Sequence, residues 1–121
     1  MTSTTGPLLH LCTEADWSRA QALGHVDALS PADVGFIHLS APYQVHLPAN
    51  RLFAGRTDLL ALRVDPALLT AEIRWEPGVP TDPESMLFPH LYGELPVAAI
   101  VAAEPYLPDS EGTFAPLPDA D

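Results

Sequence analysis

The sequence predicts a single α+β domain with about six strands in a split or strongly bent sheet and two to three short helices. Two observations predict this class. Short apolar segments recur between Gly, Pro, Asp and Ser residues, and segments of this length and setting are typical of strands. Helical patterns are confined to the first half, so the predicted order β-α-β-α-β-β-β-β is not a regular βαβ repeat. The 121 residues suit one domain.

The first elements have local start and stop signals. Residues 8–12 form an apolar segment that predicts the first strand. Thr13 is a suitable N-cap for the next helix, with Asp16 in the capping-box position three residues later. Gly24 is a suitable C-cap, since glycine adopts the left-handed conformation that often ends a helix. Residues 25–34 are then expected to form a loop.

The second strand is predicted at residues 35–40, with the sequence GFIHLS. Ser40 is expected to cap a following helix that has Pro42 near its first turn. Pro48 is expected to break that helix, because an interior proline removes a backbone hydrogen bond. A second short helix would then cover residues 49–55.

Four further strands are predicted in the second half of the chain. They cover residues 59–64, 71–76, 88–93 and 97–104. The last of these is apolar almost throughout, which predicts a buried closing strand. Asp65 and Pro66 are expected to open a single helical turn, and residues 77–85 a loop long enough to cover a site.

These elements define a single domain at residues 8–104. Residues 1–7 are small and polar and are expected to be flexible. Residues 105–121 are rich in proline and acid, which predicts a solvated tail.

The charge balance excludes some classes of partner. Sixteen acidic residues face five arginines and no lysine, for a formal net charge of −11. General nucleic-acid binding and anionic membrane binding both need basic surfaces and are not expected.

The single cysteine, Cys12, fits a reducing cytoplasm. No apolar run approaches the roughly 20 residues that cross a bilayer, and no basic residue precedes the first apolar stretch as in a signal peptide. We expect a cytoplasmic protein, with the oligomeric state left open.

Three of the predicted strands each carry a histidine. These residues are His10, His38 and His90. Alternate side chains of a strand face the same side, so each histidine has a polar or weakly polar neighbour on its face. The pairs are His10 with Cys12, His38 with Ser40, and His90 with Tyr92. Polar groups are costly to bury without partners, so we predict the functional site on this face.

The sequence contains no HExxH, GxSxG, P-loop, GxGxxG or CxxC motif, so the roles of the residues on that face stay open between alternatives. Arg51 is either a surface ion-pair partner or a phosphate clamp. Glu76 is a solvent-facing carboxylate, a general base or an acceptor for ribose hydroxyls. Tyr92 is a turn residue or an aromatic wall for a flat ring, and Ser40 is a helix cap or a nucleophile. Three neutral imidazoles are also the ligand set of several catalytic zinc and iron centres.

Six segments together resemble the uncharacterised bacterial family catalogued as domain of unknown function 952. They are LLHLCT with Trp17 downstream, GFIHLS, ANRLF, LLALRVDP, RWEP and FPHLYGEL, in that order over residues 8–104. That family is grouped by remote similarity with the ADP-ribosyltransferase superfamily. The resemblance therefore implies an ADP-ribosyltransferase-like split fold that holds NAD in a cleft between two small sheets.

The resemblance also implies roles for individual residues. His10 would contact the nicotinamide-side ribose, and His38 and Ser40 the nicotinamide end. A late strand would supply the catalytic residue, at His90, Tyr92 or Glu94. The expected catalytic set is His10, His38, Glu76, His90 and Tyr92. The expected nucleotide-binding set is His10, Thr13, His38, Ser40, Arg51 and Tyr92.

The leading hypothesis is thus a small protein that binds NAD or ADP-ribose and transfers or hydrolyses the ADP-ribose group. One alternative is a metal-dependent enzyme with the three histidines as ligands, and no metal is favoured. A second alternative is a non-catalytic module that binds a metabolite or peptide, with the acidic tail facing the partner.

Overall fold

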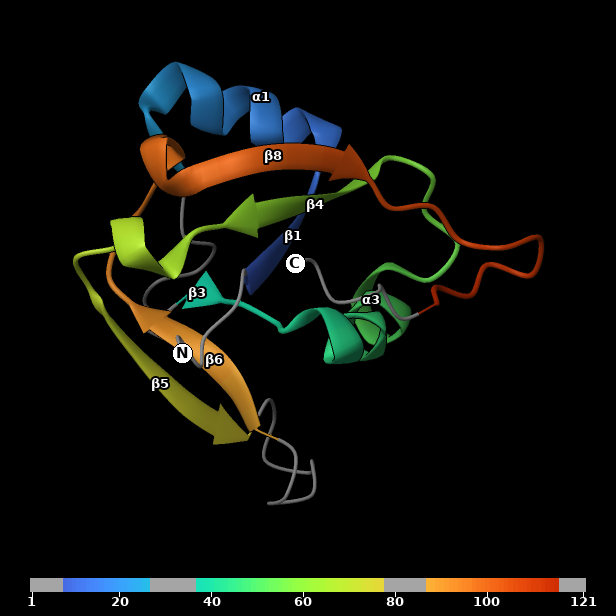
Figure 1. Cartoon of the computed structure of the whole chain (residues 1–121). Helices are drawn as coiled ribbons and strands as arrows, with labels where there is room; N and C mark the ends of the chain where they lie inside the picture. The colour runs from blue at the N-terminus through green and yellow to red at the C-terminus, as the bar shows by residue number, and fades with distance from the viewer. Residues whose placement is uncertain (1–7, 27–36, 78–86, 116–121) are drawn as a thin grey trace.

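The computed structural model describes residues 8–26, 37–77 and 87–115 (Figure 1). In these ranges the chain forms eight strands in three antiparallel sheets, together with two α-helices. The first sheet, in the order β1-β4-β8, contains β1 (Leu8–Thr13), β4 (Leu59–Val64) and β8 (Ile100–Pro105). The third sheet, in the order β3-β6-β5, contains β3 (Ile37–His38), β6 (Leu87–Tyr92) and β5 (Glu72–Pro77). A small pair joins β2 (His25–Val26) to β7 (Leu95–Pro96). The predicted α+β class and split sheet are confirmed.

Both faces of the first sheet are apolar. One face packs Leu8, Cys12 and Leu62 into a core that also contains Ala20 of helix α1 (Glu14–Leu23). The other face packs Leu9, Leu59 and Ala61 against Ala49 of helix α3 (His46–Phe53). The helices therefore lie on opposite faces of this sheet (Figure 1). The prediction that His10 lies on a polar face is wrong, because its face is an apolar core that the imidazole borders.

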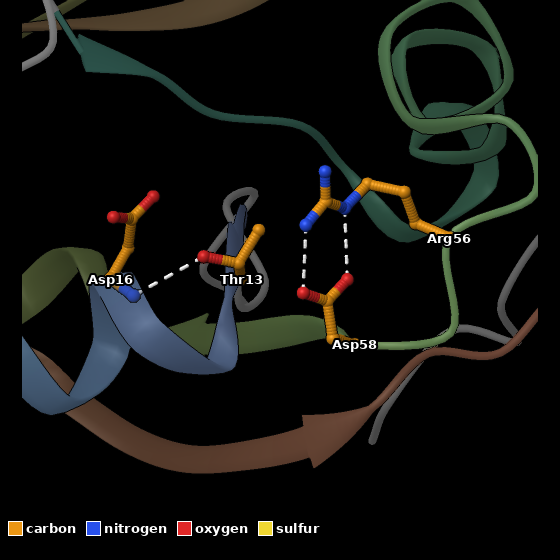
Figure 2. Close-up of polar contacts among 4 residues, drawn as sticks. All are labelled: Thr13, Asp16, Arg56 and Asp58. Carbon is orange, nitrogen blue, oxygen red and sulfur yellow. Dashed lines mark hydrogen bonds and ion pairs between the residues drawn. The ribbon is translucent and has the colours of Figure 1, made fainter.

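The predicted caps of α1 are confirmed. The Thr13 hydroxyl accepts a hydrogen bond from the Asp16 backbone N–H at 3.2 Å (Figure 2). Gly24 has φ = 90° and donates its N–H to the Ala20 carbonyl, which ends the helix. Both signals are local, so neighbouring residues alone were enough to predict them.

The predicted break at Pro48 is wrong. Helix α3 begins at His46, so Pro48 lies in its first turn. The first N–H groups of a helix have no intrahelical acceptor, and proline sacrifices no helical hydrogen bond there. Ser40 is likewise not a helix cap, since Ala41 precedes the 3₁₀ turn η1 (Pro42–Gln44). The backbone of Ser40 pairs instead with Leu9 in an isolated β-bridge.

The remaining strands agree with the predictions to within one or two residues, except at the last. Asp65 caps the 3₁₀ turn η2 (Pro66–Leu68) as expected, since its carboxylate accepts the Ala67 N–H at 3.0 Å. Residues 97–104 do not form one buried strand: η3 (Val97–Ala99) precedes β8. Among the described strands β8 pairs with β4 alone, at the edge of its sheet, and most of its side chains are exposed. The loop predicted at residues 25–34 is wrong at its start, because His25–Val26 form β2 and pair with β7. The rest of that loop, and residues 78–85 of the loop predicted at 77–85, lie outside the described residues.

Residues 106–115 do not form the solvated tail that was predicted for residues 105–121. Tyr106 and Phe114 are 4% and 1% exposed, and their rings lie 4.9 Å apart in the core beside α3. Burying two aromatic side chains outweighs the acidic, proline-rich composition around them. Residues 116–121 lie outside the described part of the chain.

Candidate functional site

The first and third sheets meet at one seam. The Leu9 N–H donates to the Ser40 carbonyl at 2.7 Å, and the Ser40 N–H donates to the Leu9 carbonyl at 2.8 Å. One residue before Ser40, the Leu39 N–H donates to the Pro89 carbonyl of β6 at 3.0 Å. Segment 37–40 thus bridges the two sheets and brings His10 of β1 next to His38 of β3.

A cavity of about 250 Å³ opens at this seam. It is lined by His10, Leu11, His38, Leu39, Ser40, Pro48, Arg51, Leu52, Phe53 and Phe88. The lining comes from β1, segment 37–40, helix α3 and the start of β6. Four residues of the predicted nucleotide-binding set, His10, His38, Ser40 and Arg51, therefore meet at one cavity.

The tautomer of His10 follows from its contact with the backbone. Its Nδ1 lies 2.9 Å from the His38 carbonyl oxygen, which can only accept. Nδ1 therefore carries the proton, and burial lowers the pKa of the ring below its ordinary value. At neutral pH this makes His10 a neutral imidazole whose Nε2 is a hydrogen-bond acceptor or a base.

His38 touches a second histidine behind the cavity. The rings of His38 and His90 meet edge to face, with centroids 5.1 Å apart and planes at 83°. The two residues are direct partners in the β3–β6 register. Burial lowers the pKa of His38, and repulsion from His90, His10 and Arg51 lowers it further. The cavity wall thus resists the addition of positive charge, which favours an anionic or neutral ligand group over a cationic one.

Glu76 lies outside the cavity and binds His90. Its Oε1 accepts hydrogen bonds from the Tyr92 hydroxyl at 2.6 Å and from His90 Nδ1 at 2.9 Å. These bonds, the tyrosine first, lower the pKa of Glu76 and keep it ionised. The Arg74 guanidinium lies 4.5 Å from the centroid of the Tyr92 ring. A second cluster is thus formed by three predicted residues, Glu76, His90 and Tyr92. Its His90 ring packs against the His38 ring on the side away from the cavity.

Two of the proposed residues, Thr13 and Glu94, lie away from both the cavity and the cluster around Glu76. The Thr13 hydroxyl is engaged in capping α1 (Figure 2), and Thr13 is not among the cavity-lining residues. The Glu94 side chain is 67% exposed, and its carboxylate lies 3.6 Å from His25 Nδ1. A late-strand carboxylate at Glu94 therefore does not reach the cavity.

The apolar wall of the cavity was missed from the sequence. Pro48 and Leu52 share a helix face with Arg51, so the helical spacing of these three residues could have indicated part of it. Phe88 comes from a distant strand, and no local pattern connects it to the others. A smaller cavity of about 60 Å³ also borders His10, together with Cys12 and Asp16.

The metal-centre alternative finds no support in the described ranges of the chain. Across these residues no group of three or more His, Cys, Asp or Glu side chains is arranged to hold a metal ion. No helix in the same ranges is long and apolar enough to span a membrane.

Comparison with known proteins places this architecture among solved structures. The sequence model of the family described as protein of unknown function (DUF952) matches residues 11–103. The crystal structure of protein CC0527 from Caulobacter crescentus is similar, with a TM-score of 0.76 and 28% identity over 89% of this chain and 92% of that one. The solution NMR structure of CC0527 has a TM-score of 0.73 and 29% identity over 88% and 90% of the two chains. No curated protein matches the chain.

Proposed function

Because the chain belongs to the DUF952 family of proteins of unknown function, we propose its activity from its own cavity: the protein binds NAD or ADP-ribose at the seam of the first and third sheets. One observation carries the proposal. His10, His38, Ser40 and Arg51 come from three separate segments and meet around one cavity of about 250 Å³. We place this activity in the cytoplasm, as the single cysteine suggests.

The lining offers complementary contacts for such a ligand. His10 Nε2, as a neutral acceptor, suits a ribose hydroxyl, which donates. Arg51 suits a phosphate, because its fork of N–H donors matches phosphate oxygens. The rings of Phe53 and Phe88 supply the apolar surface against which a flat ring packs.

The size of the cavity limits how much of the ligand it encloses. Pockets that enclose a drug-sized molecule measure roughly 300–1,000 Å³. At about 250 Å³ the cavity suits one end of a dinucleotide, such as a ring with its ribose. The rest of the ligand would lie over the open side of the cavity.

Binding is proposed as the primary activity, ahead of ADP-ribose transfer or hydrolysis. Cleavage of the nicotinamide bond builds positive charge on the ribose, which a nearby carboxylate would stabilise. Among the described residues no carboxylate lines the cavity, and Glu76 contacts the buried His90 behind it. If the bond is broken here, His10 Nε2 is the group placed to take a proton from an attacking hydroxyl.

Calorimetric titration of the full chain with NAD and with ADP-ribose tests the proposal. We expect binding of at least one of them, weakened about tenfold or more in His10→Ala and in Arg51→Gln. Arg56→Gln is the matched control, since this arginine binds Asp58 through two hydrogen bonds, at 2.8 and 2.7 Å, outside the cavity (Figure 2). Absence of binding, or equal weakening in Arg56→Gln, would overturn the assignment of the cavity.

A further inference from the structure

The segment after β8 forms an ordered strap on helix α3. We define the C-terminal strap as residues 106–115, which leave the end of β8 and return to α3 (Figure 1). The Asp109 carboxylate accepts the backbone N–H groups of Glu111 and Thr113 at 2.9 and 3.0 Å. The turn of the strap is therefore closed by its own hydrogen bonds.

Asn50 of α3 holds the strap through two hydrogen bonds. The Asn50 Nδ2 donates to the Phe114 carbonyl at 3.0 Å, and the Phe114 N–H donates back to Asn50 Oδ1 at 2.7 Å. Both backbone polar groups of Phe114 are thus satisfied by one side chain. A further bond joins the Gly55 N–H, just after the helix, to the Gly112 carbonyl at 3.1 Å.

The strap and most of the cavity lining on this helix use different faces of it, and only Phe53 borders both the cavity and the core beside the strap. Pro48, Arg51 and Leu52 are spaced three and four apart, share one face and line the cavity. Ala49 and Asn50 lie on the other face, toward the core and the strap. Helix α3 has only 8 residues, and a helix this short depends on tertiary contacts for its position.

We propose that Asn50 is a positioning residue for the cavity: by fastening α3 to the strap, it fixes where Arg51 and Leu52 stand in the cavity wall. The ligand-binding consequence rests on the proposed function, whereas the coupling between strap and helix does not. A shift of about 1 Å in a binding group is enough to cost a large part of its interaction.

The test compares Asn50→Ala with Asp65→Ala in the full chain. Asp65→Ala removes the cap of η2 and touches neither α3 nor the cavity, so it controls for a general loss of stability. We expect Asn50→Ala to weaken ADP-ribose binding about tenfold and Asp65→Ala to leave it within about twofold. Hydrogen exchange of the α3 amides, measured without ligand, should accelerate in Asn50→Ala beyond the change in global stability. If Asn50→Ala does not fold, Asn50→Asp replaces it, since aspartate keeps the acceptor for the Phe114 N–H but removes the donor to the Phe114 carbonyl.

The outcomes separate the two proposals. If the wild-type chain does not bind ADP-ribose but Asn50→Ala loosens α3, the proposed function fails and the coupling stands. If α3 exchanges as in the wild type and affinity is unchanged, Asn50 is not a positioning residue. Equal loss of affinity in both variants would also overturn the inference, since it would reflect stability alone.

Discussion

The rings of His38 and His90 meet edge to face across the pairing of β3 with β6, with centroids 5.1 Å apart. His38 lines the cavity, whereas His90 is 2% exposed and donates from Nδ1 to Glu76. A carboxylate at the end of β5 is thereby connected through one buried imidazole to a cavity-lining one. Because these groups are connected, the pH dependence of the free energy of unfolding reports on the state of the residues in and behind the cavity.

The acid limb of stability should depend on Glu76. Its pKa is lowered in the folded protein by bonds from Tyr92 and His90, so folding favours the ionised form. The stabilisation is present above the ordinary glutamate pKa and is lost as pH falls through the lower folded value. We expect wild-type stability, measured by urea unfolding, to fall between about pH 5 and pH 3, and to fall less steeply in Glu76→Gln. Identical slopes for the two proteins would contradict this account.

A second pH effect should come from His10 and His38, nearer neutrality. Both pKa values are lowered from the ordinary 6.5, mainly by burial, so the unfolded chain binds protons more readily than the folded one. Stability should therefore fall as pH drops below about 6.5 and level off below the folded values. His10→Asn retains a donor for the His38 carbonyl without titrating, so its unfolding free energy should change less between pH 7.5 and pH 5.5. A variant that keeps the full wild-type slope would exclude His10 as a contributor.

Local chemistry in the sequence predicted much of the fold. Thr13, Asp16 and Gly24 mark α1 because capping involves only neighbouring residues. Pro48 was misleading because its effect depends on its position within the helix, and the start of α3 at His46 has no side-chain cap to reveal it. Phe114 was missed because a single aromatic residue among acid and proline carries no periodicity.

The candidate site was only partly predictable, for a different reason. The residue types were identified, but which strands pair is a long-range property that side-chain alternation does not contain. His10 lies in the first sheet, whereas His38 and His90 lie in the third, and the bridge between Leu9 and Ser40 brings the two together. The sequence also could not show that Glu76 lies outside the cavity, because its contact with His90 runs diagonally from β5 to β6 and depends on the strand register.

Gly93 should be intolerant of a side chain. A Cβ built there would lie 2.5 Å from the Ala71 Cβ, which is far inside van der Waals contact. We expect Gly93→Ala to lower the unfolding free energy by about 1–3 kcal/mol through overpacking. Ala71→Gly should restore much of the loss when combined with it, as a double-mutant cycle by urea unfolding would measure. Additive effects of the two substitutions would show that the contact is not the cause.

Cys12 should be a poor nucleophile in the folded protein. Burial, followed by the nearby Asp16 charge, raises the pKa of its thiol to about 12 from an ordinary 9.0. The thiolate is the reactive form, so its population near pH 8 should fall by a factor on the order of 100–1,000 on folding. Alkylation by iodoacetamide, followed by mass spectrometry, should be slow in buffer and fast in concentrated urea. Equal rates in the two conditions would mean that this thiol is open to solvent.

The C-terminal strap should contribute to global stability through Phe114. This side chain is 1% exposed and packs with Leu9, Leu59 and Tyr106 in the core beside α3. We expect Phe114→Ala to lower the unfolding free energy by about 3–5 kcal/mol, because it removes a buried ring and leaves a cavity. Leu107→Ala is the matched control in the same segment, since Leu107 is 58% exposed and its loss should cost less than about 0.5 kcal/mol. Urea unfolding of the full chain measures both values, and a Phe114→Ala variant as stable as Leu107→Ala would mean that residues 106–115 are a solvated tail after all.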